Sequence, residues 1–238
     1  MAFAQRKRMT TSIVILAKQP VEGRTKMKLA RTLGNAYAAK LAECFIRDTL
    51  ALVRNLPVGQ KNVAYSPEEA RGYFRELVRP LLEFSTYPQR GQHLGERMQN
   101  AIQREFSGGA DSVVLLDTDS PTLPPHYVTR AFELLKKADF VLGPTYDGGC
   151  YLVGTSLPST TPLASVPWGT PQVFKKTVYN ISKAGLRLAL TPPWYDVDTE
   201  HGFEMLKSHI EALAYSGATG IPTHTAAWLT TMENHPSR

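Results

Sequence analysis

Short apolar runs alternate along this chain with longer segments in which apolar residues recur at helical spacing. Apolar runs of about four to eight residues, bounded by polar or turn residues, are typical of strands buried in a sheet. The run VVLL at residues 113–116 has no polar position, which is typical of a central strand covered on both faces. The predicted strands are residues 12–17, 61–66, 81–87, 112–116, 139–143, 150–154 and 186–191.

Helical patterns separate these runs and supply the connections between them. The predicted helices are residues 29–55 or 35–55, 67–78, 96–106, 126–137 and 172–184, with a final helix after Thr199. Alternation of strand and helix predicts right-handed crossovers and a mostly parallel sheet with helices on both faces. We therefore expect one α/β domain over residues 11–215, with a disordered basic tail at 1–10 and a polar tail at 216–238, where the periodicity fades.

The composition is that of an ordinary one-domain globular protein, with 238 residues, 42% of them apolar and 20% charged. No apolar run approaches the roughly 18 residues that span a bilayer, and the first residues lack the pattern of a cleavable leader. Cys44 and Cys150 stand apart, which favours a reducing compartment over a disulfide framework. We expect a cytoplasmic protein without a membrane span.

The formal charge is +6, and the basic residues concentrate near the front of the chain, where residues 18–40 contain a single acid, Glu22. Nucleic-acid-binding surfaces more often carry a long basic stripe with interleaved aromatic residues, so we expect no nucleic-acid partner. A compact loop with Lys18, Gly23, Arg24 and Lys26 better suits a small phosphate ligand, because glycine permits close backbone approach and the cations neutralise phosphate. From this stretch alone, a solvated basic turn is an equal alternative.

Two acidic pairs follow predicted strands and precede predicted helices. Asp117 and Asp119 follow the central strand, and Asp196 and Asp198 follow the last one. Because ligands of open α/β sheets bind at the carboxyl ends of strands, both pairs can meet there and hold a hard divalent cation. The alternative is that one aspartate of each pair caps the following helix and the other is solvated.

Two further loops carry ligand-binding chemistry. Gln89, Leu94 and Gly95 lie between the third strand and its helix, where an amide and exposed backbone can contact a nucleobase; a plain surface loop is the alternative. Asp147 stands beside the pair at 148–149, where a ligand can approach bare backbone; a simple hairpin turn competes with this interpretation.

Six motifs in order resemble a known family: AK-x-P-x-x-G-x-x-K, Q-x-G-x-x-LGERM, TDSPTLP, GP-x-x-DGG-x-YLVG, VPW-x-T and DVDT. Over residues 13–206 the chain resembles a bacterial glycosyltransferase-A-fold family of the nucleotide-diphospho-sugar transferase superfamily. That family is similar to the guanylyltransferases of cofactor assembly, such as the phospholactate enzyme. The resemblance implies a single Rossmann-like three-layer sandwich with a mostly parallel central sheet.

The resemblance also implies roles for individual residues. Lys18 and Lys26 would face the nucleotide phosphates, and Gln89 and Gly95 would lie near the base; the loops that hold them add Gly23, Arg24 and Leu94 to the expected nucleotide site. Asp147, Gly148 and Gly149 would line the acceptor or sugar side, to which we add Trp168 and Thr170 of the VPW-x-T motif. The resemblance implies Asp119 and Asp198 as ligands for Mg²⁺ or Mn²⁺; the two acidic pairs add Asp117 and Asp196 to the expected metal ligands, and the expected catalytic residues are Lys26, Asp119 and Asp198. The family usually has glycine where this chain has Asp117, which leaves the role of that residue open.

The sequence thus predicts a metal-dependent transferase that uses a nucleotide sugar or a nucleoside triphosphate (NTP) and a small-molecule acceptor. Glycosyl transfer is favoured, because Asp117 completes an Asp-x-Asp and the Gly-Gly-x-x-x-Arg-Met-Gly-x-x-Lys loop of many nucleotidyltransferases is missing. The alternatives are guanylyltransferase-like nucleotidyl transfer with release of pyrophosphate, and a nucleotide-binding protein without catalysis. The oligomeric state is left open.

Overall fold

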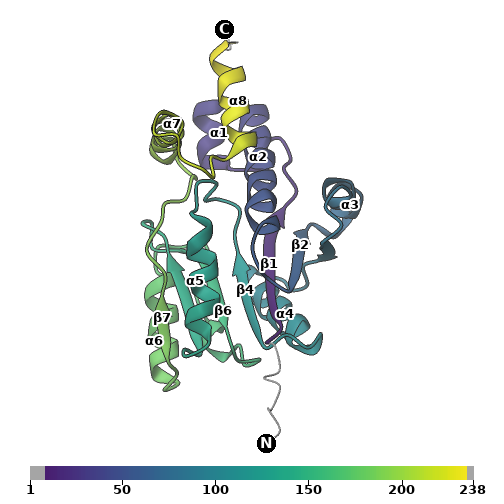
Figure 1. The fold of residues 1–238 in the computed structure, drawn as a ribbon, viewed down its shortest axis with the longest axis vertical. Coiled ribbons are helices and arrows are strands. Elements are labelled where there is room, and N and C mark those ends of the chain that lie inside the picture. The colour runs from purple at the N-terminus through teal and green to yellow at the C-terminus, as the bar shows by residue number, and fades with distance from the viewer. Residues whose placement is uncertain (1–8, 235–238) are drawn as a thin grey trace, which may run out of the picture.

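The computed structural model describes residues 9–234, so most of the predicted basic tail lies outside the described residues. Seven strands form one sheet (Figure 1). They are β1 (Thr11–Lys18), β2 (Gln60–Ser66), β3 (Phe84–Pro88), β4 (Ser112–Leu116), β5 (Phe140–Pro144), β6 (Cys150–Thr155) and β7 (Leu188–Leu190). The α-helices are α1 (Met27–Leu33), α2 (Asn35–Arg54), α3 (Arg71–Val78), α4 (Leu94–Ser107), α5 (Pro125–Leu135), α6 (Val173–Lys183), α7 (Glu200–Tyr215) and α8 (Thr223–Asn234).

The sheet has the strand order β3-β2-β1-β4-β6-β5-β7 and is mostly parallel, as the sequence predicts. Only β6 runs antiparallel, to both β4 and β5. The turn between β5 and β6 is therefore a hairpin turn, closed by a bond from Thr145 N to Gly149 O at 3.1 Å. All other pairings are parallel, so the carboxyl ends of β1, β2, β3, β4, β5 and β7 share one edge of the sheet.

Alternating residues of the strands are buried against different helices. Ile13 and Ile15 of β1 pack into a core with α2, α3 and α5, whereas Val14 packs into a second core with α4 and α6. This alternation follows from the two-residue period of a strand. It explains why the middle of β1 and residues 113–116 of β4 lack polar positions, since both faces of the sheet are covered there.

A third apolar cluster lies beyond the carboxyl edge of the sheet, where α1, the start of α2, α7 and α8 gather (Figure 1). The predicted first helix is in fact two helices. Gly34 separates α1 from α2 with a φ of +85°, a conformation that glycine adopts readily. The cluster packs α1 and α2 against α7, and so anchors the β1–α1 loop and the segment before α7.

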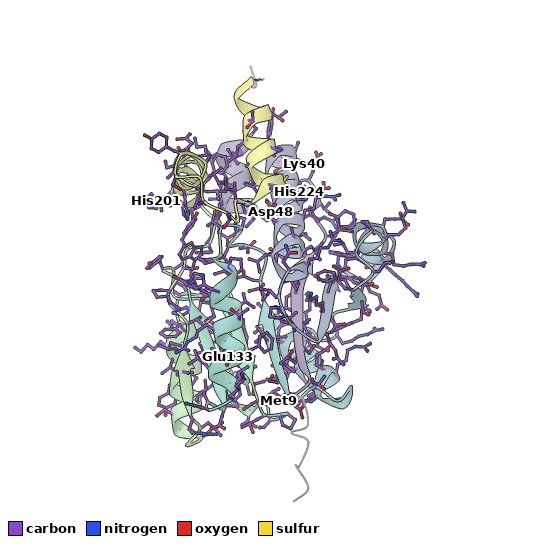
Figure 2. The ribbon with its side chains drawn as sticks, viewed as in Figure 1. Met9, Lys40, Asp48, Glu133, His201 and His224 are labelled. Carbon is purple, nitrogen blue, oxygen red and sulfur yellow. The ribbon has the colours of Figure 1, made fainter. Side chains whose placement is uncertain are left out.

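The predicted polar tail at 216–238 is wrong for residues 223–234, which form α8. Trp228 and Leu229 are buried in the third cluster. The buried Asp48 of α2 accepts bonds from His224 N, Thr225 N and Thr225 Oγ1 at 2.9, 2.8 and 2.6 Å, and Figure 2 shows Asp48 beside His224. The carboxylate thereby satisfies free N–H groups at the start of α8. Within the described residues, no helix is both long enough and apolar enough to cross a membrane.

Candidate functional site

A cleft of about 520 Å³ opens along the carboxyl edge of the sheet. Its walls come from the ends of β1 and β4, the β1–α1 loop, the start of α4, the β5–β6 turn, the loop before α6 and the segment between β7 and α7. This volume is within the range of small-molecule sites, and the position is where ligands of open α/β sheets bind.

Charged residues of opposite sign line different parts of this cleft. Its basic residues come from β1, the β1–α1 loop and its continuation into α1, and α4: they are Lys18, Arg24, Lys26, Lys28 and Arg97. Its acidic residues come from the loop after β4, the β5–β6 turn and the segment before α7: they are Asp117, Asp119, Asp147, Asp196 and Asp198. The cleft therefore has a basic part towards β1 and an acidic part towards β4, β5 and β7.

Backbone contacts bring the two acidic segments together. Val197 N donates to Asp119 O at 2.9 Å, and Ser120 Oγ donates to Tyr195 O at 3.0 Å. Behind them, the Tyr195 hydroxyl contacts Thr122 Oγ1 at 2.7 Å and His209 Nδ1 at 2.8 Å. These bonds fix the loop after β4 against the segment before α7.

Lys26 crosses from the basic loop into the acidic part. Its ammonium lies 2.7 Å from Asp119 Oδ1, 2.9 Å from Asp198 Oδ1 and 2.8 Å from Val197 O. The Lys26 side chain is 5% exposed, whereas those of Asp119 and Asp198 are 38% and 44% exposed. Burial alone would lower the pKa of Lys26, but Asp119 and Asp198 raise it above its ordinary value, so the lysine is charged.

The remaining acidic groups are crowded. Burial, followed by the charge of Asp119, raises the pKa of Asp117 well above its ordinary value. Burial and then Asp147 raise the pKa of Asp196 to about 6. Burial likewise raises the pKa of the Cys150 thiol to about 12, so this cysteine is a neutral part of the wall. Crowded carboxylates of this kind favour the arrival of further positive charge.

The donor set fits a hard divalent cation in its chemistry. Carboxylate and carbonyl oxygens are the ligands that Mg²⁺ and Mn²⁺ prefer, and three such oxygens already converge on one positive charge, the Lys26 ammonium. Among residues 9–234, no group of three or more His, Cys, Asp or Glu side chains is arranged to hold a metal ion. The ammonium contacts two of the four carboxylates that the sequence predicts for the metal, Asp119 and Asp198, together with the carbonyl of Val197.

The part of the cleft beside the acidic residues combines a carboxylate with an aromatic ring. Asp147 Oδ1 accepts from Thr145 Oγ1 and from Gly149 N at 2.9 Å, which fixes the orientation of the carboxylate. Trp168 lines the same cleft, and its indole N–H is buried without a hydrogen-bond partner in the described structure.

The predicted base contact Gln89 is partly engaged within the fold. Its Nε2 donates to Ala64 O at 2.8 Å and Ala17 O at 3.3 Å, so Oε1 is the atom of this amide left for a ligand. Leu94 also lines the cleft.

Most of the sequence-predicted residues line this one cleft. They are Lys18, Arg24, Lys26, Gln89, Leu94, Asp117, Asp119, Asp147, Gly149, Trp168, Thr170, Asp196 and Asp198.

Three predicted glycines shape the walls instead of lining the cleft. Gly23 forms a turn, with a φ of +71°. Gly95 lies against the Trp168 ring, and Gly148 lies against the carbonyl of Pro171, where a side chain would clash. The bare backbone at Gly148 is thus used by the protein's own chain.

Sequence reasoning missed two residues of the site. Arg97 lines the cleft within the quoted LGERM motif, where a basic residue one turn into a helix was the available signal. The ring of Phe45 lies 5.0 Å from the Lys26 ammonium, and nothing in the sequence around α2 indicates this contact.

The chain is similar in sequence and in fold to known proteins. The family model "Uncharacterized protein conserved in bacteria (DUF2064)" matches residues 49–170. No curated protein matches the chain. A solved protein from Desulfovibrio desulfuricans G20, described as a "putative nucleotide-diphospho-sugar transferase", is 29% identical with a TM-score of 0.84, over 95% of this chain and 96% of that one.

Two more distant structures share the fold. A cytidylyltransferase from Leptospira borgpetersenii is 14% identical with a TM-score of 0.55, over 96% of each chain. A CMP:2-keto-3-deoxy-manno-octonic acid synthetase complexed with CTP is 12% identical with a TM-score of 0.53, over 85% of this chain and 99% of that one. The single α/β domain predicted from the sequence is confirmed as the fold of nucleotide-diphospho-sugar transferases.

Proposed function

The chain belongs to the DUF2064 family of bacterial proteins, and we propose that it is a transferase that moves a glycosyl group from a nucleotide-diphospho-sugar to a small acceptor. In this proposal the donor lies along the divided cleft, with Mg²⁺ or Mn²⁺ at the acidic part. The division of charge within one cleft is the observation that carries the proposal.

The basic part is suited to the phosphates of the donor. Within the described residues, Lys18, Arg24, Lys28 and Arg97 form no ion pair with any carboxylate, although all four line the cleft. Lys18 is held only by a 3.3 Å bond from its ammonium to Arg24 O. Unpaired cations gathered in a concave site are available to neutralise a phosphate ligand.

The acidic part is suited to the cation that accompanies such phosphates. The ion, when bound, would neutralise the negative charge of the departing diphosphate. Asp119 and Asp198 would hold it, because they are the carboxylates with the greatest exposure in the oxygen set around Lys26. Asp117 lies deeper, and its Oδ1 accepts from Asp119 N at 3.2 Å, which positions the second aspartate.

The wall beyond the aspartates favours a sugar as the group transferred. Asp147 is oriented by two donors and can accept bonds from hydroxyl groups, while the Trp168 ring offers an apolar face to the cleft. A carboxylate beside an indole complements the mixed polar and apolar surface of a pyranose. We assign Asp147, Trp168 and Thr170 to the sugar and acceptor side.

Nucleotidyl transfer is the second candidate, and the number of unpaired cations favours it. A triphosphate carries about four negative charges, and four unpaired basic side chains line the cleft. A neighbour of the same fold binds CTP. In this alternative the chain would join a nucleotide to a phosphorylated acceptor and release pyrophosphate.

Product analysis separates the two candidates. The purified protein is incubated with Mn²⁺ and a panel of nucleotide sugars, and released nucleoside diphosphate is quantified by ion-exchange chromatography. Glycosyl transfer predicts metal-dependent release of nucleoside diphosphate, including slow hydrolysis without acceptor, and its loss in Asp119→Asn. Metal-dependent exchange of labelled pyrophosphate into a nucleoside triphosphate, without any diphosphate release from sugars, would reject glycosyl transfer.

A further inference from the structure

Three oxygens surround the Lys26 ammonium, as oxygens surround a bound metal cation. Two carboxylate oxygens and one carbonyl oxygen surround it at 2.7, 2.9 and 2.8 Å. These oxygens belong to segments 93, 171 and 172 residues away along the chain, so the contact is a product of the tertiary fold. An ammonium has three N–H donors, and all three have acceptors here.

The rest of the ammonium's surroundings are closed. The fully buried Phe45 places its ring 5.0 Å from Nζ, in a cation–π contact. An aromatic face favours a cation that has lost its water shell, and the buried ammonium of Lys26 is such a cation. The three oxygens and the Phe45 ring therefore form a site that matches an ammonium group, which a general acidic surface would not.

The backbone of Lys26 is also unusual. It has φ +44° and ψ +52° immediately before α1, and Lys26 and Ser165 are the non-glycine residues between 9 and 234 with positive φ. This left-handed conformation is disfavoured for a residue with a Cβ atom, so surrounding contacts must hold it. The three bonds of the ammonium are contacts of that kind.

A divalent cation at the same oxygens could not coexist with the ammonium. Mg²⁺ requires oxygens at about 2.0–2.1 Å, so an ion bound to Asp119 and Asp198 would lie in the space of Nζ or directly against it. Two positive charges at such a distance repel strongly. Either the metal or the lysine can use these two oxygens at one time.

We propose that Lys26 is a built-in cation of the Asp119–Asp198 site, which a divalent metal ion must displace before it binds there. This inference rests on the proposed function for the use of a divalent cation. It assigns Lys26 a positioning role in the free protein: the lysine holds the loop after β4 and the segment before α7 together and keeps the site closed to metal. Metal entry then frees the Lys26 side chain within the basic part of the cleft.

The first test measures metal affinity in the absence of nucleotide. Mn²⁺ is titrated into the full-length protein while the free aquo ion is followed by electron paramagnetic resonance. We expect Lys26→Met to bind Mn²⁺ at least about tenfold more tightly than wild type, because the competing charge is gone. Lys28→Met is the matched control: it removes the same charge from the same cleft but forms no ion pair with these carboxylates, and should bind Mn²⁺ like wild type.

The second test uses the unaltered protein, so it holds even where Lys26→Met fails to fold. Acetic anhydride labelling read by mass spectrometry should find Lys26 protected without metal and several-fold more reactive with saturating Mn²⁺, while the exposed Lys28 stays constant. Unchanged protection of Lys26 in Mn²⁺, or Mn²⁺ affinity in Lys26→Met no higher than in wild type, would overturn the inference.

The same variants separate this inference from the proposed function. Tighter Mn²⁺ binding by Lys26→Met than by wild type, together with no binding of any nucleotide sugar by the wild-type protein, would retain the competition and reject the transferase. Metal-dependent binding of a nucleotide sugar by wild type, with equal Mn²⁺ affinity in wild type and Lys26→Met, would support the transferase and reject the competition.

Discussion

Gly95 lies at a point where one methyl group should disturb the candidate site without disturbing the fold. It is the second residue of α4, and a Cβ atom there would lie 2.6 Å from Trp168 Nε1 and 2.8 Å from Trp168 Cδ1. Unstrained carbon contacts require about 3.5–4.0 Å, so in Gly95→Ala the indole must withdraw from α4 by about 1 Å. Trp168 belongs to a loop, which can move more easily than the helix.

In Gly95→Ala we expect little change in the stability of the fold but weaker binding of the donor. Alanine is better than glycine within a helix by up to about 1 kcal/mol, which offsets the lost contact, so the free energy of unfolding should stay within about 1 kcal/mol of wild type. Donor binding should weaken, because the displaced indole no longer meets the sugar. An aromatic contact of this kind contributes about 1–1.5 kcal/mol, which corresponds to roughly tenfold in the dissociation constant.

The assay pairs urea unfolding with calorimetric titration of the nucleotide sugar that the product analysis identifies. Gly72→Ala is the matched control, because Gly72 is likewise the second residue of its helix, α3, and a Cβ there meets nothing within 4 Å. That control should keep wild-type affinity. Wild-type donor affinity in Gly95→Ala, with a shifted tryptophan emission that shows the indole has moved, would refute the placement of the sugar beside Trp168.

Two further predictions concern the parts of the fold that support the site. Asp48→Ala should destabilise the protein by about 2 kcal/mol in urea unfolding, because two backbone N–H groups of α8 lose their acceptor; a loss below about 0.5 kcal/mol would contradict this capping role. Burial lowers the pKa of His209, so the unfolded chain takes up more protons below its ordinary pKa of about 6.5, and stability should fall as the pH drops from about 7 to 5. Thermal unfolding across that range should show a smaller fall in His209→Gln; an identical fall would assign the effect to other groups.

Strands β1, β4 and β5 were predictable because both of their faces are buried. A continuous apolar run such as that of β4 is typical of a strand covered on both faces, and each of the seven predicted runs overlaps a strand of the sheet. The residues at which the strands begin and end were less predictable. β3 begins at Phe84 rather than at residue 81, and Leu82 is 93% exposed, because an apolar residue in a turn resembles the start of a strand.

Helix α8 could not be predicted for a different reason. Its sequence mixes threonine with a few apolar residues, so its buried side is narrow, and the carboxylate that caps it lies on α2, 177 residues earlier than Thr225. A helix whose start is completed by a distant residue gives little local signal. The break at Gly34 is the opposite case, since the sequence allowed a start on either side of it and the structure has helices on both.

At the site, the sequence placed the residues but not their contacts. Strands that end at one edge bring Lys26, Asp119 and Asp198 together, and this much follows from fold topology. The direct contact of Lys26 with both carboxylates depends on a left-handed backbone conformation and on the wall formed by Phe45. Neither feature has a local signature in the sequence.

The central claim is that one cleft binds the phosphates of a nucleotide donor at its basic part and their metal ion at its acidic part. Thermal unfolding with the identified nucleotide sugar, measured with Mn²⁺, without Mn²⁺ and with Mn²⁺ alone, tests this most directly. A donor at 100 times its dissociation constant should stabilise the protein by about 2.7 kcal/mol, which corresponds to roughly 5–10 °C. The account predicts this shift only when donor and Mn²⁺ are both present, and its loss in Asp198→Asn. An equal shift in the presence of chelator, or one retained by Asp198→Asn, would contradict the divided cleft as the donor site.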